Sequence, residues 1–125
     1  MTAAVTSLGV HHVSINVQDT AESVAFYTEV LGLIERSDRP EFSFDGAWLD
    51  LGPQQVHLLE IEVPADEGQH FAITVVDLES AVADLRSRGI DVTDPAAVGT
   101  GWQSFLHDPS GNRIELHEPG GTTRV

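Results

Sequence analysis

The chain has 125 residues, with 20 Asp and Glu against six Lys and Arg, and a formal net charge of −14. That length allows one domain, or two very small halves of one. With 41% hydrophobic residues the chain can bury a core, while its negative charge repels phosphate backbones and anionic lipid surfaces. We therefore expect a soluble protein that binds a small-molecule substrate or another subunit, with no nucleic acid and no membrane as partner.

Two missing residue types exclude several chemistries. Without Lys there is no Schiff base and no phosphate-loop lysine, and without Cys there is no disulfide, thiolate nucleophile or Cys-ligated zinc. Any metal site must use His, Asp or Glu. The N-terminus lacks a basic stretch followed by a long apolar one, and no run reaches the roughly 18 apolar residues of a membrane span. These features favour a cytoplasmic location.

An internal repeat organises the sequence. A shift of the chain against itself by 58 positions places residues 12–19 on residues 70–77, so that His12 falls on His70. The match continues without a gap to the end of each half. We interpret the two halves as copies of one supersecondary unit.

The same elements are predicted in each copy, in the order βαβββ. The first copy has an alternating strand, then a helix opened by the capping residue Asp19, then three short strands. Asp77 opens the helix of the second copy, and Gly89 ends it. The expected ranges are a strand at 10–17, a helix at 20–31 and strands at 33–37, 42–51 and 55–61, followed in the second copy by strands at 90–93, 102–107 and 112–117.

These elements predict an α+β fold in which two βαβββ modules form a curved mixed sheet with helices on its outer faces. The modules cover residues 8–61 and 68–118. Because either module alone would bury too little surface, we expect them to fold together as a single domain over residues 1–125.

Polar side chains share one face of the first and last strands in each copy. His12 and His70 occupy this face on the first strands, and His57 and Glu115 occupy equivalent positions on the last strands. If a pseudo-twofold axis relates the copies, the four side chains approach one another. Three imidazoles and one carboxylate suit Zn, Ni, Fe(II) or Mn. We therefore predict a divalent metal ion as cofactor.

Other polar residues near these positions leave alternatives open. Arg113 has the same strand parity as Glu115, so an ion pair between them is the structural alternative to a metal site. His11 is expected to point to the face opposite the ligands. His117 shares the face of Glu115 and is a candidate for lining the pocket or carrying a proton. The role of His107 stays open.

The sequence resembles the vicinal oxygen chelate superfamily, which includes glyoxalase I, methylmalonyl-CoA epimerase, extradiol dioxygenases and the fosfomycin and bleomycin resistance proteins. The resemblance rests on the doubled unit and covers nearly the whole chain. Its motifs are residues 12–19, Phe26-Tyr27 before residues 30–33, and residues 105–116. Residues 39–49, together with 56–60, are similar to a glyoxalase-I-like subgroup.

This resemblance implies roles for individual residues. The metal ligands are His12, His57, His70 and Glu115, and Glu115 also acts catalytically by moving a proton of the substrate. The metal polarises neighbouring oxygens of the substrate and stabilises an enediolate-type intermediate. Residues implied in substrate binding are Ser14, Asn16, Trp48, Thr74 and His117, with Ala72 and Leu59 as further lining. A homodimer is also implied.

Three activities are compatible with the resemblance. The first is a metal-dependent, glyoxalase-I-like lyase or isomerase that acts on a small vicinal-oxygen substrate. For this activity the chain departs from the glyoxalase I pattern at His57, where that enzyme usually has Glu or Gln. The second is an Fe(II) extradiol-type dioxygenase, whose open fourth position His57 would crowd. The third is a non-catalytic ligand-binding or resistance protein.

Three residues in the segment before residue 49 have two interpretations each. Trp48 and Phe44 are candidates either for the wall of the pocket or for ordinary core. Arg39 is a candidate for meeting an anionic group of the substrate, or is a surface residue at a turn.

Overall fold

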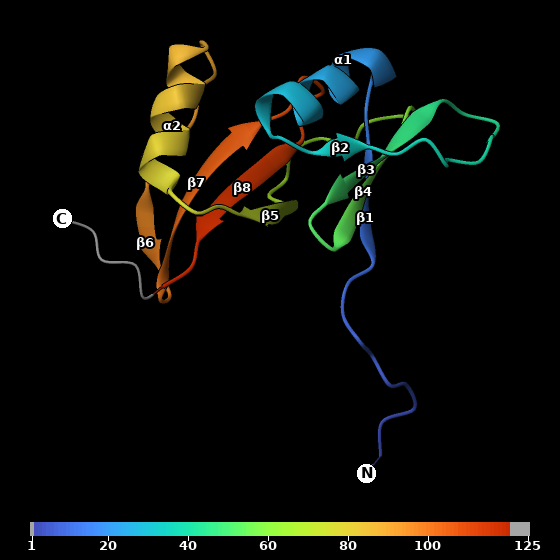
Figure 1. The fold of residues 1–125 in the computed structure, drawn as a ribbon, viewed down its shortest axis with the longest axis horizontal. Coiled ribbons are helices and arrows are strands. Elements are labelled where there is room, and N and C mark those ends of the chain that lie inside the picture. The colour runs from blue at the N-terminus through green and yellow to red at the C-terminus, as the bar shows by residue number, and fades with distance from the viewer. Residues whose placement is uncertain (1, 121–125) are drawn as a thin grey trace.

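A computed structural model of the chain describes residues 2–120 and contains two units with the same order of elements (Figure 1). The first unit comprises β1 (His12–Asn16), α1 (Thr20–Ala25), the π-helical turn η1 (Phe26–Val30), β2 (Ile34–Glu35), β3 (Gly46–Leu51) and β4 (Gln54–Leu59). The second comprises β5 (His70–Thr74), α2 (Leu78–Ser87), β6 (Ala96–Val98), β7 (Gly101–His107) and β8 (Arg113–Glu118). The predicted α+β class and the order βαβββ in each half are confirmed.

Each unit builds its own four-stranded mixed sheet. The strand orders are β1-β4-β3-β2 and β5-β8-β7-β6. In both sheets the first strand of the unit pairs in parallel with the last, and the other pairs are antiparallel. Helix α1 contacts β3 and β4, and α2 contacts β7 and β8 (Figure 1). Within residues 2–120 the strands thus form two hydrogen-bonded sheets, one for each module.

The two sheets have the same register at the predicted shift of 58 positions. Ser14 lies opposite His57 in the first sheet, and Ala72 lies opposite Glu115 in the second. In both sheets, therefore, the last strand presents its candidate ligand next to the first strand, on the face that the alternation predicts.

Matched carboxylates support the start of each helix. Glu60 accepts a hydrogen bond from the backbone N–H of Thr20, and Glu118 accepts one from that of Leu78, both at 2.9 Å. The first N–H groups of a helix have no partner within the helix, so these carboxylates satisfy them and complement the helix dipole. The last strand of each unit is thereby fixed to the helix of the same unit.

Both predicted helix caps are present. Asp19 and Asp77 each accept a hydrogen bond from the backbone N–H three residues further on, at 2.9 and 3.1 Å. The first helix continues through η1 to Val30, close to the predicted end. Gly32 and Gly89 follow the helices with φ near +78°, a conformation that favours glycine.

Two predicted strands differ from the observed ones. The run at 42–51 is a strand only from the start of β3, since residues 42–45 form a loop. The prediction of a strand at 90–93 is wrong, and β6 follows it instead. Thr93 does lie beside β7, but its side-chain Oγ1 accepts a hydrogen bond from the backbone N–H of Phe105 at 2.8 Å. In a regular sheet that N–H would donate to a backbone carbonyl of a neighbouring strand. The side-chain bond replaces part of the regular ladder.

A buried hydrogen bond connects the two units. Tyr27 is fully buried and donates to Oδ2 of Asp108 at 2.7 Å. Asp108 also accepts from the backbone N–H groups of Ser110 and Asn112 within the predicted turn, both at 2.9 Å. Asn112 in turn donates its side-chain amide to the carbonyl of Asn16 at 2.8 Å. Burial, with the adjacent carboxylate, raises the pKa of Tyr27, so the phenol stays protonated and keeps donating.

The apolar core lies under both sheets and includes the inward residues of the last strands, Val56, Leu58, Ile114 and Leu116. Their exposed fractions are 2% or less, as the predicted alternation requires. None of the helices in residues 2–120 has the length and apolar character needed to cross a bilayer.

Candidate metal centre

The first sheet brings His12 and His57 together on neighbouring parallel strands. Their rings stack with centroids 4.1 Å apart and an interplanar angle of 16°. Burial, and then the nearby His12 and His11, lowers the pKa of His57 below its usual value near 6.5. A neutral imidazole has a free ring nitrogen for a metal ion. We call His12 and His57 the N-terminal half-site.

Two further residues join this half-site. Nδ1 of His11 lies 2.9 Å from Nδ1 of His12, so the expectation that His11 points away from the ligands is wrong. His11 precedes β1, where the alternation of a regular strand does not apply. Gln55, which the sequence analysis missed, places Oε1 2.8 Å from Nε2 of His57. It has the strand parity of His57, which is the signal that identifies it.

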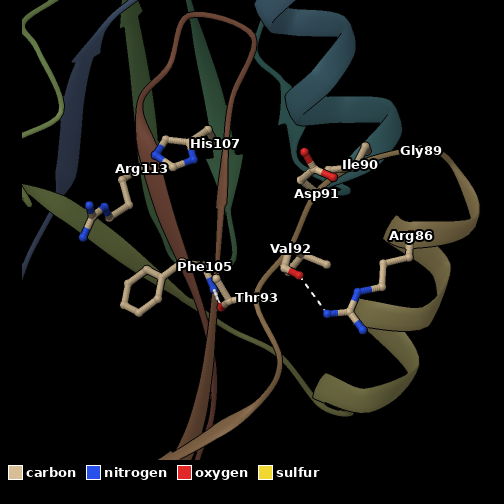
Figure 2. A pocket seen from close by; sticks show the side chains of 9 residues that line it. All are labelled: Arg86, Gly89, Ile90, Asp91, Val92, Thr93, Phe105, His107 and Arg113. Atoms are coloured by element: carbon tan, nitrogen blue, oxygen red, sulfur yellow. Dashed lines mark hydrogen bonds between the residues drawn. The ribbon is translucent and has the colours of Figure 1, made fainter.

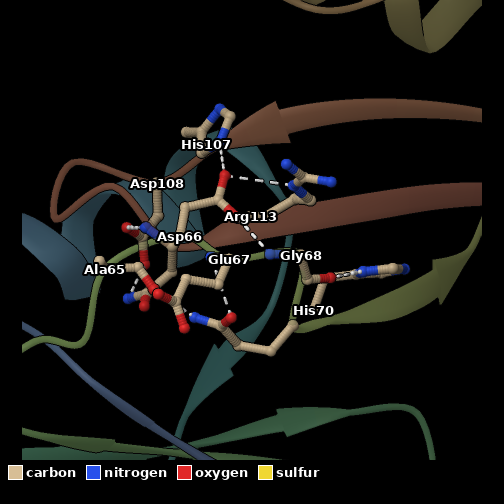
Figure 3. Close-up of polar contacts among 10 residues, drawn as sticks. Ala65, Asp66, Glu67, Gly68, His70, His107, Asp108 and Arg113 are labelled. Atoms are coloured by element: carbon tan, nitrogen blue, oxygen red, sulfur yellow. Dashed lines mark hydrogen bonds and ion pairs between the residues drawn. The ribbon is translucent and has the colours of Figure 1, made fainter.

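The second sheet brings His70 and Glu115 together. Nε2 of His70 lies 3.1 Å from Oε1 of Glu115. Nδ1 of the same ring lies 2.7 Å from the carbonyl oxygen of Gly68, which can only accept a hydrogen bond (Figure 3). Nδ1 therefore carries the hydrogen, and in the neutral ring Nε2 directs a lone pair at the carboxylate. We call His70 and Glu115 the C-terminal half-site.

The contact between these two groups requires a proton or a metal ion between them. A lone pair and a carboxylate oxygen at 3.1 Å repel each other unless a proton on Nε2 or a metal ion compensates. A carbonyl that fixes the other ring nitrogen is the usual arrangement around a metal-binding His. The side chain of Glu115 is only 13% exposed, so water compensates its charge poorly.

Neighbouring side chains define the surroundings of Glu115. His117 places Nδ1 3.3 Å from Oε2 of Glu115, so the predicted shared face is confirmed. Arg113, the alternative partner for Glu115, instead donates from Nε to Asp66 at 3.2 Å. Thr74 lies opposite His117 in the sheet register, in line with the candidate ligands.

Asp66 ties the segment between the units to β7 and β8 (Figure 3). Its Oδ2 lies 2.8 Å from Nε2 of His107, and its Oδ1 accepts the backbone N–H of Gly68 at 3.0 Å. The hydrogen bond with His107, followed by the one with Gly68 and the neighbouring Arg113, lowers the pKa of Asp66 to about 2. Because the carbonyl of Gly68 orients His70, Asp66 supports that candidate ligand indirectly.

The single chain brings the predicted ligands together in two pairs. In the part of the chain that the structure describes, no group of three or more His, Asp or Glu side chains is arranged so that it could hold a metal ion. A groove of about 380 Å³ runs between β1 and β5 and includes the predicted substrate residues Ser14 and Asn16 together with His70. Asn16 donates its amide to the carbonyl of Glu62 at 2.7 Å.

Trp48 lies beside the N-terminal half-site. It is the cross-strand neighbour of His57, and the two rings stack with centroids 4.3 Å apart. Trp48 is only partly buried. Its interpretation as an ordinary core residue is therefore wrong, and its place in the wall of a pocket stays a prediction.

A pocket of about 690 Å³, which the sequence analysis missed, lies along β7 beside residues 89–93 (Figure 2). Phe105 connects it to the C-terminal half-site, because its ring lies edge-on to His70 at 5.2 Å. Arg86 closes the other side and donates to the carbonyl of Val92 at 2.8 Å (Figure 2). Phe105 pairs with Glu115 across the sheet, so strand parity alone places it on the ligand face.

The fold defines a class of proteins with two βαβββ modules. In this chain the first and last strands of each module present the candidate ligands on one face. The sequence model of one protein family, the glyoxalase/bleomycin resistance protein/dioxygenase superfamily, matches residues 9–116. The chain belongs to this superfamily, which confirms the resemblance seen in the sequence.

Individual relatives include lactoylglutathione lyases. The chain is 32% identical to that of Salmonella typhimurium, over 86% of the chain and 90% of the relative. It is also 32% identical to a lactoylglutathione lyase of Arabidopsis thaliana over 89% of the chain, but it spans only 44% of that protein. A solved glyoxalase family protein from Enterococcus faecalis is 30% identical, with a TM-score of 0.71 over 88% of the chain and 97% of that structure.

Proposed function

We propose that this protein is a metal-dependent lyase or isomerase of the glyoxalase I type, which acts on a small substrate with two neighbouring oxygens. The observation that carries the proposal is the C-terminal half-site, where a fixed imidazole and a poorly hydrated carboxylate converge in an arrangement that suits a divalent cation. The lactoylglutathione lyases among the relatives support the same chemistry.

The donor set fits a divalent ion. We propose that His12, His57, His70 and Glu115 hold it, since imidazole and carboxylate ligands together suit Zn, Ni, Fe(II) or Mn. When bound, the ion supplies Lewis-acid polarisation of the two substrate oxygens.

The side chains around the ion divide the remaining work. Glu115 is positioned to accept the proton from the carbon beside the substrate carbonyl and to return it to the neighbouring carbon. Nδ1 of His117 lies 3.3 Å from Oε2 of Glu115, so a protonated His117 steadies the carboxylate between the two transfers. His57 is a neutral ligand where glyoxalase I usually has Glu or Gln, so Glu115 performs both proton transfers.

We propose further that two copies of the chain share each metal site. The two half-sites occupy equivalent positions on the two sheets, yet only pairs of ligands meet within the described part of one chain. A twofold dimer that faces the N-terminal half-site of one copy with the C-terminal half-site of the other completes two identical sites.

Mixed dimers test this arrangement. One variant carries His12→Ala and His57→Ala, and the other carries His70→Ala and Glu115→Gln. Each variant alone should bind no stoichiometric metal. If sites are shared, a heterodimer of the two variants has one intact site and one without ligands, so metal analysis should find one ion per dimer. Sites built within one chain would leave every site damaged and the heterodimer empty, which contradicts the shared site.

The activity is tested on the metal-loaded wild type with the hemithioacetal of methylglyoxal and glutathione. We expect conversion to the thioester, observed by its ultraviolet absorbance, and loss of turnover in Glu115→Gln. Oxygen uptake with catechol by the Fe(II)-loaded protein would instead identify a dioxygenase. Metal binding without either reaction would identify a ligand-binding protein and contradict the proposal.

A further inference from the structure

Three aromatic residues extend from the N-terminal half-site. Trp48 stacks on His57 at an interplanar angle of 7°, and His12 covers the other face of His57. Beyond Trp48 lies Phe42, with its ring centroid 6.4 Å from that of Trp48 and tilted by 46°. Phe42 stacks in turn on Phe44 at 5.4 Å. We call Phe42, Phe44 and Trp48 the aromatic shelf, which continues the line of rings that begins at the candidate ligands.

Arg39 fixes the shelf in position. Its guanidinium carbon lies 4.9 Å from the ring centre of Phe42 and 5.7 Å from that of Phe44. One terminal nitrogen also donates to the carbonyl of Phe44 at 2.9 Å. Gly46 leaves room for this nitrogen, because a Cβ there would lie only 3.1 Å from it. The loop before β3 is therefore held in one arrangement without belonging to a strand.

The shelf presents apolar surface to solvent next to the half-site. Phe42 is 48% exposed, and Trp48 is partly exposed. Exposed aromatic surface beside polar ligands is typical of a binding site, because a planar apolar group placed there is removed from water and stacks on the rings.

We infer that the aromatic shelf binds an aryl substituent of the substrate, carried next to the two chelating oxygens. Phe42 and Trp48 contact the substituent, and Arg39 is a positioning residue that acts through Phe42 and Phe44. The inference rests on the proposed function, since the shelf lies beside two of the proposed metal ligands. It adds the substrate class: aryl compounds are preferred over alkyl ones of the same chelating chemistry.

Acetohydroxamate and benzohydroxamate test the shelf without turnover. Both chelate a divalent metal through the same two oxygens, and they differ in a methyl against a phenyl group. For the metal-loaded protein we expect benzohydroxamate to bind about tenfold more tightly by calorimetry. The protein has two Trp residues. In the Trp102→Phe background Trp48 is therefore the only tryptophan, and benzohydroxamate should change its emission when tryptophan is excited selectively.

Substitutions locate the preference. Phe42→Ala and Trp48→Leu should each lower the ratio of the two dissociation constants to about twofold or less. The ratio is the measured quantity, because Trp48 also stacks on His57 and its substitution can change the affinity for both hydroxamates together. Ile34→Ala is the matched control, because Ile34 is an exposed apolar residue of the same sheet, with 68% exposure, and lies outside the shelf. Its ratio should equal that of the wild type. Far-UV circular dichroism verifies folding of each variant.

The outcomes separate the two proposals. Equal binding of both hydroxamates, or a phenyl preference that survives both shelf substitutions, overturns the aromatic shelf and leaves the metal site standing. Failure of both hydroxamates to bind, together with failure to retain metal, overturns the proposed function and the shelf with it.

Discussion

Tyr27 and Asp108 show how one pair of side chains couples the two units. The phenol comes from the helix of the first unit and the carboxylate from the turn between β7 and β8. Both residues are at least 95% buried, with exposed fractions of 0% and 5%. A hydrogen bond that is removed from water in this way leaves an unsatisfied group when one partner is deleted.

Tyr27→Phe should lower the free energy of unfolding by about 1–3 kcal/mol, because the carboxylate loses a buried donor while its other donors remain. Urea denaturation measures the loss. Metal content should not change, since neither half-site includes Tyr27. A loss within the roughly 0.5 kcal/mol of an ordinary surface substitution would contradict the assigned role.

Gly46 is required for a different reason. Its backbone lies so close to the carbonyl oxygen of Leu58 on the neighbouring strand β4 that a Cβ would overlap that oxygen. Gly46→Ala should therefore destabilise the protein by about 1–3 kcal/mol through displacement of β3 from β4. Thermal unfolding measures this loss, with Ser43→Ala in the exposed preceding loop as the control. An unchanged melting temperature in Gly46→Ala would show that displacing β3 from β4 at this point costs no stability.

At the scale of elements, periodicity and capping predicted most of the fold. Alternation identified the buried and polar faces of the first and last strands, and Asp19 and Asp77 identified both helix starts. These features depend on residues that are close in the sequence. The prediction of a strand at 90–93 was wrong because the side chain of Thr93 forms a hydrogen bond with β7 that no local pattern indicates.

The segment between the units is an element whose stability depends on pH. Asp66 has its pKa lowered to about 2, from a usual value near 3.9. A carboxyl with a lowered pKa in the native state stabilises the fold above the unfolded pKa and loses this contribution as the pH falls. The relevant window lies between about pH 4 and pH 2.

Asp66→Asn should be less stable than the wild type at pH 5, and the difference in melting temperature should shrink as the pH approaches 2. The reason is that protonation removes from the wild type the same charge that the substitution removes. Thermal unfolding of both proteins at intervals from pH 5 to pH 2.5 checks the trend. A difference that stays constant over this range would mean that the ion pairs of Asp66 with His107 and Arg113 do not stabilise the native state.

At the scale of the whole molecule, the two sheets present two incomplete ligand pairs. If two copies share each site, metal binding and association are linked, because only the dimer has all four ligands. Removal of the metal then acts on both stability and oligomeric state.

Treatment with EDTA followed by dialysis should lower the melting temperature and increase the monomer fraction, as measured by sedimentation velocity at several protein concentrations. A ligand at 100 times its dissociation constant stabilises the bound state by about 2.7 kcal/mol, so the shift should be readily measurable. Return of Zn²⁺ should reverse both changes. Equal monomer fractions with and without metal would show that dimer formation does not depend on metal binding, which contradicts a shared site.

The sequence by itself determined the doubled module, the α+β class, the helix caps and the strand faces, because the shift of 58 positions and the alternation of side chains are properties of the linear order. Only the tertiary structure decided how the candidate ligands are grouped. The two pairs of candidate ligands lie on separate sheets, and Phe105 contacts the ring of His70 from a distant part of the chain. The carbonyl of Gly68 also orients that ring through a hydrogen bond whose geometry depends on the packing of the connecting segment. Such contacts follow from how the sheets and the connecting segment pack, which no periodicity in the sequence records.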